Sequence, residues 1–272
     1  MPKYKSKLVR FIQKVDTDRG LFLASGLAFD FLVCFIPFLM VLSSLLGHFL
    51  FSAKEVAQHL QDYLSRVIPF ASGKITHNIL QLVKDRKVIG ALGFFGLIWT
   101  STRLFASLRT VLSIIYGSEN RRGILHGKLT DILMVFLIGL LFVFSILLTL
   151  FINLVHRFSK TLSWNLPFGI AGWGAWGVAV SIFITLTMFF LIYKTLPDKS
   201  VSFKLAGISA LFSTILWEAL KTGFGYYVHY FGRFMEIYGS FGLMVLFFFW
   251  IYYSALTFIL GAEVGWIWGG EE

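Results

Sequence analysis

Residues 135–142 read Val-Phe-Leu-Ile-Gly-Leu-Leu-Phe, a stretch with no polar side chain and no alternation of apolar and polar positions. Membrane β-barrel strands would alternate over about ten residues. A helix instead needs about 20 apolar residues to cross a bilayer, and all its backbone hydrogen bonds are satisfied within the segment. Comparable apolar runs cover residues 21–51, 88–116, 129–155, 170–196, 203–230 and 241–268. The sequence therefore predicts an all-α, polytopic membrane protein.

The composition of the whole chain agrees with these runs. Hydrophobic residues make up 57% of its 272 residues, and the mean hydropathy is +0.77. Six spans of this length leave no room for a second soluble domain. We therefore expect a single transmembrane domain over residues 1–272, built as a six-helix bundle.

The formal net charge of +10 would suggest a nucleic-acid partner in a soluble protein. In a membrane protein, Lys and Arg gather in the cytoplasmic loops and orient the spans. The basic residues of the N-terminal segment and of the short loops after the second and fourth runs are Lys3, Lys5, Lys7, Arg10, Lys14, Arg19, Arg121, Arg122, Lys128, Lys194, Lys199 and Lys204. The opposite short loops carry Arg157, Lys160 and Arg233. We expect cytoplasmic termini, contacts with anionic lipid head groups on that side, and no nucleic acid.

The first extracytoplasmic loop, residues 52–87, is the exception to this charge pattern because it is long and basic. Apolar residues recur at helical spacing over residues 56–68 and again over residues 75–83, which predicts two short amphipathic helices. They would lie on the outer leaflet or cover the bundle as a lid, and the sequence leaves both readings open.

Proline and glycine mark two features of the spans. Pro37 removes a backbone donor within the first run, so a kink is expected there. Gly90, Gly93 and Gly96 recur every third residue and predict a close helix contact. Residues 172–177 match the dinucleotide fingerprint G-x-G-x-x-G literally. They open an apolar span rather than a strand-to-helix turn, so helix packing is the better reading.

Charged residues inside the spans are the strongest functional signal, because a charge near the bilayer centre is costly and rarely faces lipid. They are Asp30, Arg103, Arg109, Asp131, Glu218, Lys221 and Glu263. Glu218 and Lys221 stand three residues apart on one helix and can pair, with Glu218 facing the bundle interior. Asp30 and Arg103 both fall in the cytoplasmic half and can meet across helices. The seven residues are either structural clasps or the lining of a polar route.

The sequence carries no recognisable catalytic, metal-binding or cofactor-binding motif. Its six histidines are scattered and show neither H-x-H nor H-E-x-x-H spacing. Neither a nucleophile elbow nor a P-loop is present. We therefore expect no enzymatic activity, no metal and no cofactor.

Several short blocks, in order along nearly the whole chain, resemble the YihY/BrkB family of bacterial inner-membrane proteins. These blocks are ASGLAF at residues 24–29, FIP at 35–37, WTSTR at 99–103, LWEALK at 216–221, YGSFG at 238–242 and GAE at 261–263. The resemblance implies six spans with cytoplasmic termini in the inner membrane. At Asp30 the family typically carries an aromatic residue, so an acidic role there would be particular to this chain.

The resemblance supplies no settled activity. The family has carried a ribonuclease BN label, which nothing in this sequence supports, and its members are otherwise treated as transporters or virulence-associated envelope proteins. Two functions stay open. The chain moves a lipid or another amphiphile past its intramembrane charges, or it is a non-transporting envelope protein whose outer loop docks partners. A homo-oligomer is compatible with either function.

Overall fold

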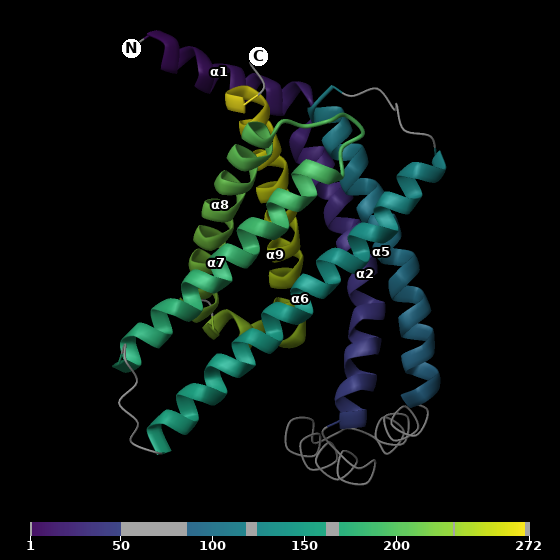
Figure 1. Cartoon of the computed structure of the whole chain (residues 1–272), viewed down its shortest axis with the longest axis vertical. Coiled ribbons are helices and arrows are strands. Elements are labelled where there is room, and N and C mark those ends of the chain that lie inside the picture. Colours follow the sequence, from purple (N-terminus) through teal and green to yellow (C-terminus); the bar gives the residue numbers. More distant parts are fainter. Residues whose placement is uncertain (1, 50–85, 118–123, 162–168, 231, 270–272) are drawn as a thin grey trace. The chain divides into compact units, whose positions relative to one another are not determined.

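A computed structural model describes residues 2–49, 86–117, 124–161, 169–230 and 232–269. Within these residues the regular structure is helical throughout (Figure 1). The helices are α1 (Pro2–Thr17), α2 (Gly20–Phe49), α5 (Arg86–Ile115), α6 (Ile124–Thr161), α7 (Gly169–Thr195), α8 (Phe203–Tyr230) and α9 (Gly232–Gly269). The predicted all-α class is confirmed for the described part of the chain.

Five helices contain a stretch long and apolar enough to cross a membrane. These stretches are Gly20–Ser44, Gly90–Ile115, Gly177–Thr195, Phe203–Val228 and Met244–Gly269. The expected span 129–155 falls within α6, a helix of 38 residues whose side chains are described only in part. The sixth span therefore stays a prediction. Large apolar side chains such as Leu140, Phe183 and Ile215 are more than half exposed, as lipid-facing residues are.

Helical structure also extends beyond the predicted apolar runs. The N-terminal basic segment forms a separate helix, α1, which hydropathy does not predict. Helix α9 begins at Gly232, before the predicted run 241–268, and α6 extends beyond both ends of the run 129–155. A helix can continue past an apolar run because its backbone hydrogen bonds are made within the helix and do not depend on apolar side chains. The two amphipathic helices expected over residues 56–68 and 75–83 lie outside the described residues. The last two residues of that loop, 86 and 87, form the start of α5.

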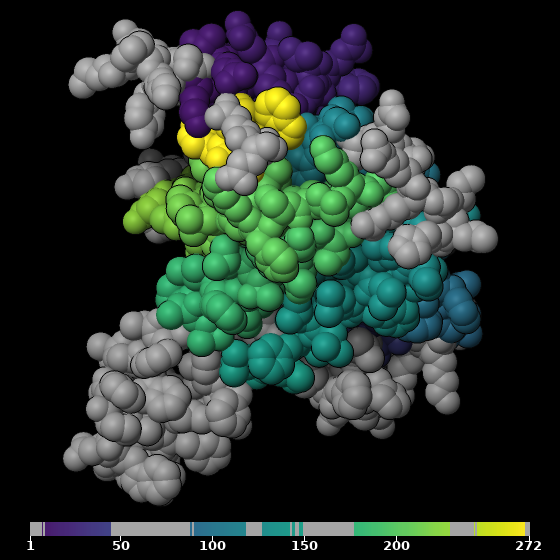
Figure 2. Space-filling view, turned by 45° about the horizontal axis from the view of Figure 1, so that its top comes forward, coloured from purple at the N-terminus to yellow at the C-terminus, as the bar shows by residue number. Residues whose placement is uncertain are grey.

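The chain divides into two compact units, Met1–Phe29 with Phe105–Glu272, and Asp30–Leu104. In the larger unit α8 packs against both α7 and α9, α6 packs against α7, and α1 packs against α9. Helix α1 runs crosswise to α8 and α9 (Figure 1). A space-filling view shows it over the yellow C-terminal end of α9 (Figure 2). The single domain expected over residues 1–272 stays a prediction.

In the smaller unit, the glycines of α5 pack closely against α2, as their spacing predicts. A Cβ atom at Gly93 would lie 2.8 Å from the Cβ of Met40, and one at Gly96 would lie 3.3 Å from the Cβ of Pro37. Gly90 faces Ser44 in the same way. Helix α2 is assigned as helical on both sides of Pro37, which is itself buried. Pro37 thus contributes to packing as well as removing a donor.

Candidate functional site: the intramembrane ion pairs

All seven charged residues predicted from the spans take part in ion pairs. In the smaller unit, the Nε atom of Arg103 on α5 donates to Asp30 Oδ1 on α2 at 3.1 Å. Asp30 is almost buried, whereas 66% of the Arg103 side chain is exposed. The expected contact between these two residues is therefore present, and it leaves the guanidinium at the surface of its unit.

A second group forms around Arg109 near the end of α5 in the larger unit. Its Nη2 atom donates to Asp131 Oδ2 on α6 at 2.9 Å, and its Nη1 atom lies 3.7 Å from Asp198 Oδ1. Asp131 is fully buried and Asp198 nearly so. Gly127 makes room for this guanidinium, since a Cβ atom there would lie 2.7 Å from Arg109 Cζ. One cation is thus held between two carboxylates.

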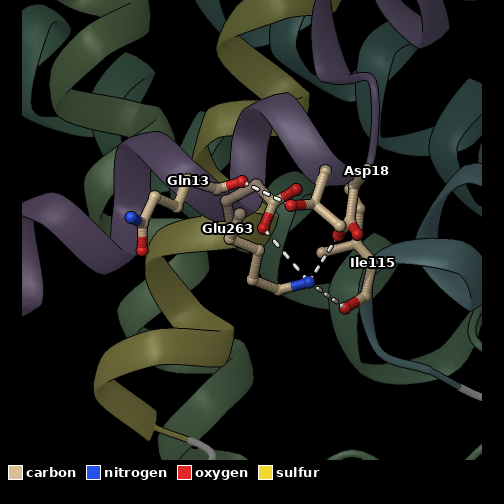
Figure 3. Close-up of polar contacts among 6 residues, drawn as sticks. Gln13, Asp18, Ile115 and Glu263 are labelled. Carbon is tan, nitrogen blue, oxygen red and sulfur yellow. Dashed lines mark hydrogen bonds and ion pairs between the residues drawn. The ribbon is translucent and has the colours of Figure 1, made fainter.

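A third group fastens α1 to α9. The Nζ atom of Lys14 lies 3.5 Å from Oε2 of the fully buried Glu263, pairs with Asp18, and donates to the carbonyl of Ile115 at 3.0 Å (Figure 3). It also lies 4.4 Å from the centre of the Trp266 ring, a cation–π contact. Glu263 was predicted as an intramembrane charge, and Lys14 is the partner that the prediction lacked.

The fourth group is the predicted pair within α8. Lys221 Nζ lies 2.7 Å from Glu218 Oε1, and the two side chains keep 36% and 30% of their surface exposed. The predicted pair is therefore present and mostly covered, and the orientation of Glu218 toward the bundle interior stays a prediction. No ion pair among the described residues of the larger unit joins this pair to the groups around Arg109 and Lys14. Within the larger unit, the described ion pairs thus form three separate groups.

Aromatic rings gather beside the α8 pair. Trp217, next to Glu218 in the chain, lies with its ring centre 5.4 Å from that of Trp250 on α9 and 6.5 Å from that of Phe189 on α7. Phe224, one turn beyond Lys221, lies 4.6 Å from Trp250. The partly exposed charges thus stand on α8 next to an aromatic cluster contributed by three helices.

A buried hydroxyl network joins α7, α8 and α9. The Tyr193 hydroxyl donates to the carbonyl of Phe258 at 2.6 Å and lies 2.7 Å from Ser213 Oγ. The Tyr193 ring stacks on Phe258 with centres 5.0 Å apart. One turn before Ser213 on α8, Ser209 Oγ lies 3.4 Å from the hydroxyl of Tyr116, the residue that follows α5. These contacts give the buried tyrosine and serine hydroxyls polar partners inside the larger unit.

Small residues bring α8 and α9 together along this network. A Cβ atom at Gly265 would lie 3.0 Å from the Leu205 carbonyl oxygen, and one at Gly269 would lie 2.6 Å from Leu205 Cα. Gly261 faces Ser213 in the same way. This stripe at four-residue intervals is the small-xxx-small pattern of close helix pairs. This four-residue spacing of glycines is visible in the sequence and could have predicted the close contact between α8 and α9. Asp198 lies in a loop, where no periodic pattern indicates its partner.

Comparison with known proteins gives a consistent picture. The model of the family described as "Virulence factor BrkB" matches residues 11–269. The ribonuclease-like protein YfkH of Bacillus subtilis is 26% identical over 262 residues, covering 95% of this chain and 94% of its own. A UPF0761 membrane protein of Pseudoalteromonas atlantica is 24% identical, covering 97% and 86%. The UPF0761 membrane protein RSc1559 of Ralstonia nicotianae is 28% identical, covering 97% of this chain and 59% of its own. No solved structure matches the chain.

Proposed function

Because the chain belongs to the BrkB family of integral membrane proteins, we propose that it moves a lipid or another amphiphile across the bacterial inner membrane. In this proposal α6 supplies the sixth span, and an even number of spans returns both termini to the cytoplasm. The basic short loops on that side support this orientation. The protein acts on its substrate by binding and exposure, without covalent chemistry.

The observation that carries the proposal is the partly exposed pair Glu218–Lys221 near the middle of a candidate span. A charge at this depth is costly unless it meets water, another protein or a polar ligand group. The buried pairs Arg109–Asp131 and Lys14–Glu263 are enclosed by protein, so they serve as clasps. The Glu218–Lys221 pair is the most exposed of the ion pairs described in the larger unit, so it is the one best placed to meet a partner.

The chemistry of this pair matches a phospholipid head group. The Lys221 ammonium can bind a phosphate oxygen, and the Glu218 carboxylate can accept hydrogen bonds from a head-group amine. The neighbouring rings of Trp217, Phe224 and Trp250 provide an apolar surface for an acyl chain. We propose that the Glu218–Lys221 ion pair separates to bind the lipid head group while the aromatic rings bind its acyl chain.

The test uses the purified protein in vesicles that contain a fluorescent phospholipid, with a membrane-impermeant quencher added outside. The parent protein should expose inner-leaflet lipid faster than protein-free vesicles do. The double variant Glu218→Gln/Lys221→Met should lose most of that rate. The matched control Thr222→Val changes an exposed, uncharged residue on the same helix and should retain the parent rate.

Two results would contradict the proposal. A parent rate equal to that of protein-free vesicles would exclude movement of that lipid. A double variant that is as fast as the parent would exclude the pair from the transport path. The charge-swapped variant Glu218→Lys/Lys221→Glu keeps the ion pair but reverses its orientation. Retained stability with reduced transport would then assign a head-group contact to the pair.

A further inference from the structure

Arg103 carries a positive charge at the surface of the smaller unit, near the middle of a candidate span. It stands about 18 Å along the helix axis from the end of the span Gly90–Ile115, at a rise of about 1.5 Å per residue. Its side chain is 66% exposed, more than that of any other ion-paired residue that the structure describes. A charge at this depth is costly unless a polar group meets it. The exposed part of Arg103 therefore requires an anionic or polar partner.

The ion pair with Asp30 occupies only one side of the guanidinium. Asp30 Oδ1 accepts a hydrogen bond from the Nε atom of Arg103 at 3.1 Å, and among the described residues this is the ion pair that Arg103 makes. A guanidinium holds its five N–H donors in a planar fork, so the N–H groups of the two terminal nitrogens remain for a ligand. This fork matches two oxygens of one phosphate or carboxylate. The arrangement therefore suits an anionic ligand with paired oxygen atoms.

The exposed face of α5 beside Arg103 is aromatic and apolar. Trp99 lies one turn before Arg103 and Phe95 one turn before Trp99, and the side chains of Trp99 and Phe95 are 78% and 71% exposed. The opposite face of the helix packs against α2, where a Cβ atom at Gly93 would lie 2.8 Å from the Cβ of Met40. A ligand on the exposed face therefore meets a cation at one end and large apolar side chains along the helix. These are the two chemistries of a phospholipid, whereas a free anion would leave the aromatic surface without a partner.

We infer that Arg103 and Trp99 form a binding site for the phosphate group of a phospholipid. The terminal nitrogens of Arg103 donate to two phosphate oxygens, while Asp30 holds the guanidinium through its Nε atom. The acyl chains lie along the rings of Trp99 and Phe95. A phosphate bound at this depth draws the head-group layer toward the bilayer centre, as the local thinning around intramembrane arginines does. The inference rests on the proposed function, since it names a head-group contact for a lipid in transit, but the site belongs to the smaller unit and does not use the ion pair of α8.

The test measures lipid binding by native mass spectrometry of the full-length protein, delipidated in detergent and titrated with dioleoylphosphatidylglycerol. Dioleoylglycerol has the same acyl chains without a phosphate, and glycerol 3-phosphate is a soluble phosphate without acyl chains. The parent protein should bind the phospholipid at a saturable site and dioleoylglycerol about tenfold more weakly or worse, as the loss of a charge-assisted hydrogen bond predicts. An excess of glycerol 3-phosphate should leave the phospholipid bound.

The two members of the ion pair should respond differently to substitution. Arg103→Gln should weaken phospholipid binding by about tenfold or more. Asp30→Asn keeps the guanidinium and should bind the phospholipid at least as tightly as the parent does. The double variant Asp30→Asn/Arg103→Gln leaves no unpaired carboxylate and keeps the net charge, and it should bind as weakly as Arg103→Gln. The control Lys199→Gln removes an exposed positive charge from a loop and should keep the parent affinity.

Four outcomes would overturn the inference. Equal binding of the phospholipid and dioleoylglycerol would exclude a phosphate contact. Equal effects of Arg103→Gln and Asp30→Asn would reduce the pair to a structural clasp. Displacement by glycerol 3-phosphate would assign the site to a soluble anion. A parent dimer that Arg103→Gln converts to a monomer would assign the exposed guanidinium to a second copy of the chain.

The binding measurement involves no movement of lipid between leaflets, so its failure and the failure of the transport proposal are distinguishable. A parent protein that binds the phospholipid through Arg103 but moves no lipid would contradict the transport proposal alone. A parent protein that moves lipid but whose binding does not depend on Arg103 would contradict the site alone.

Discussion

Replacing Tyr193 with Phe tests whether the buried hydroxyl network stabilises the larger unit. Tyr193 has no exposed surface, and its hydroxyl makes contacts of 2.6 Å to the Phe258 carbonyl and 2.7 Å to Ser213 Oγ. Phenylalanine keeps the stacking on Phe258, so the substitution isolates the hydroxyl. Interhelical hydrogen bonds in membranes contribute about 0.6 kcal/mol on average, with a maximum near 1.7 kcal/mol. Two of them predict a loss of about 1–3 kcal/mol.

The assay is thermal unfolding in detergent, followed by the loss of the monodisperse elution peak. For a chain of this size, about 1 kcal/mol corresponds to roughly 2–4 °C, so Tyr193→Phe should lower the midpoint by about 2–12 °C. The control is Tyr226→Phe, which removes the same hydroxyl from a side chain that is 65% exposed and should change the midpoint little. Equal midpoints for the two variants would refute the reasoning.

A second step separates the contact to Ser213 from the rest of the network. A double-mutant cycle of Tyr193→Phe with Ser213→Ala should give a coupling energy of at least about 0.5 kcal/mol if the hydroxyls bond to each other. Additive losses would show that each group acts through its backbone partner alone. Gly261→Ala should be better tolerated in the double variant, because its Cβ atom would otherwise meet Ser213 Oγ and lie 2.8 Å from Tyr193 Oη.

Three further results are expected. Arg109→Met leaves two buried aspartates without their cation and should destabilise the protein by about 3–5 kcal/mol, measured by the same unfolding assay; replacing both aspartates with asparagine as well should recover part of that loss. Gly93→Leu should lower the unfolding midpoint because its Cβ would lie 2.8 Å from a Met40 carbon, whereas Gly139→Leu, with nothing within 4 Å of its Cβ position, should not. Reporter fusions at the two termini should both report the cytoplasm, and an external C-terminus would mean that the number of spans is odd.

Hydropathy predicted the helices that cross the apolar core, because continuous apolar runs depend only on local composition. The run 203–230 coincides with α8. Helix α1 was missed because its residues are too polar for that criterion. Phe11 and Val15, one turn apart and both half-buried, carry the amphipathic signal that periodicity could have found.

Pairing was predictable only where the partners are close in sequence or were both recognised as intramembrane charges. Glu218 and Lys221 share a helix face, and Asp30 and Arg103 fall at similar depth. The partner of Glu263 could not be inferred in this way, because Lys14 lies in a segment first read as an orienting cluster of positive charge. Asp198 reaches Arg109 from a loop, and no local spacing indicates which charge a loop residue will meet.

The glycine stripe on α9 limits how the larger unit can change shape. Where large flexible side chains meet, helices can slide past one another by exchanging rotamers. At Gly261, Gly265 and Gly269 the opposing atoms belong to Ser213, Ser209, the Tyr193 hydroxyl and Leu205, including Leu205 backbone atoms, so α8 and α9 approach closely at each of the three positions. A sliding motion of α9 along α8 would drive these atoms into the glycine backbone. Conformational changes are therefore expected to carry α8 and α9 together as one rigid body.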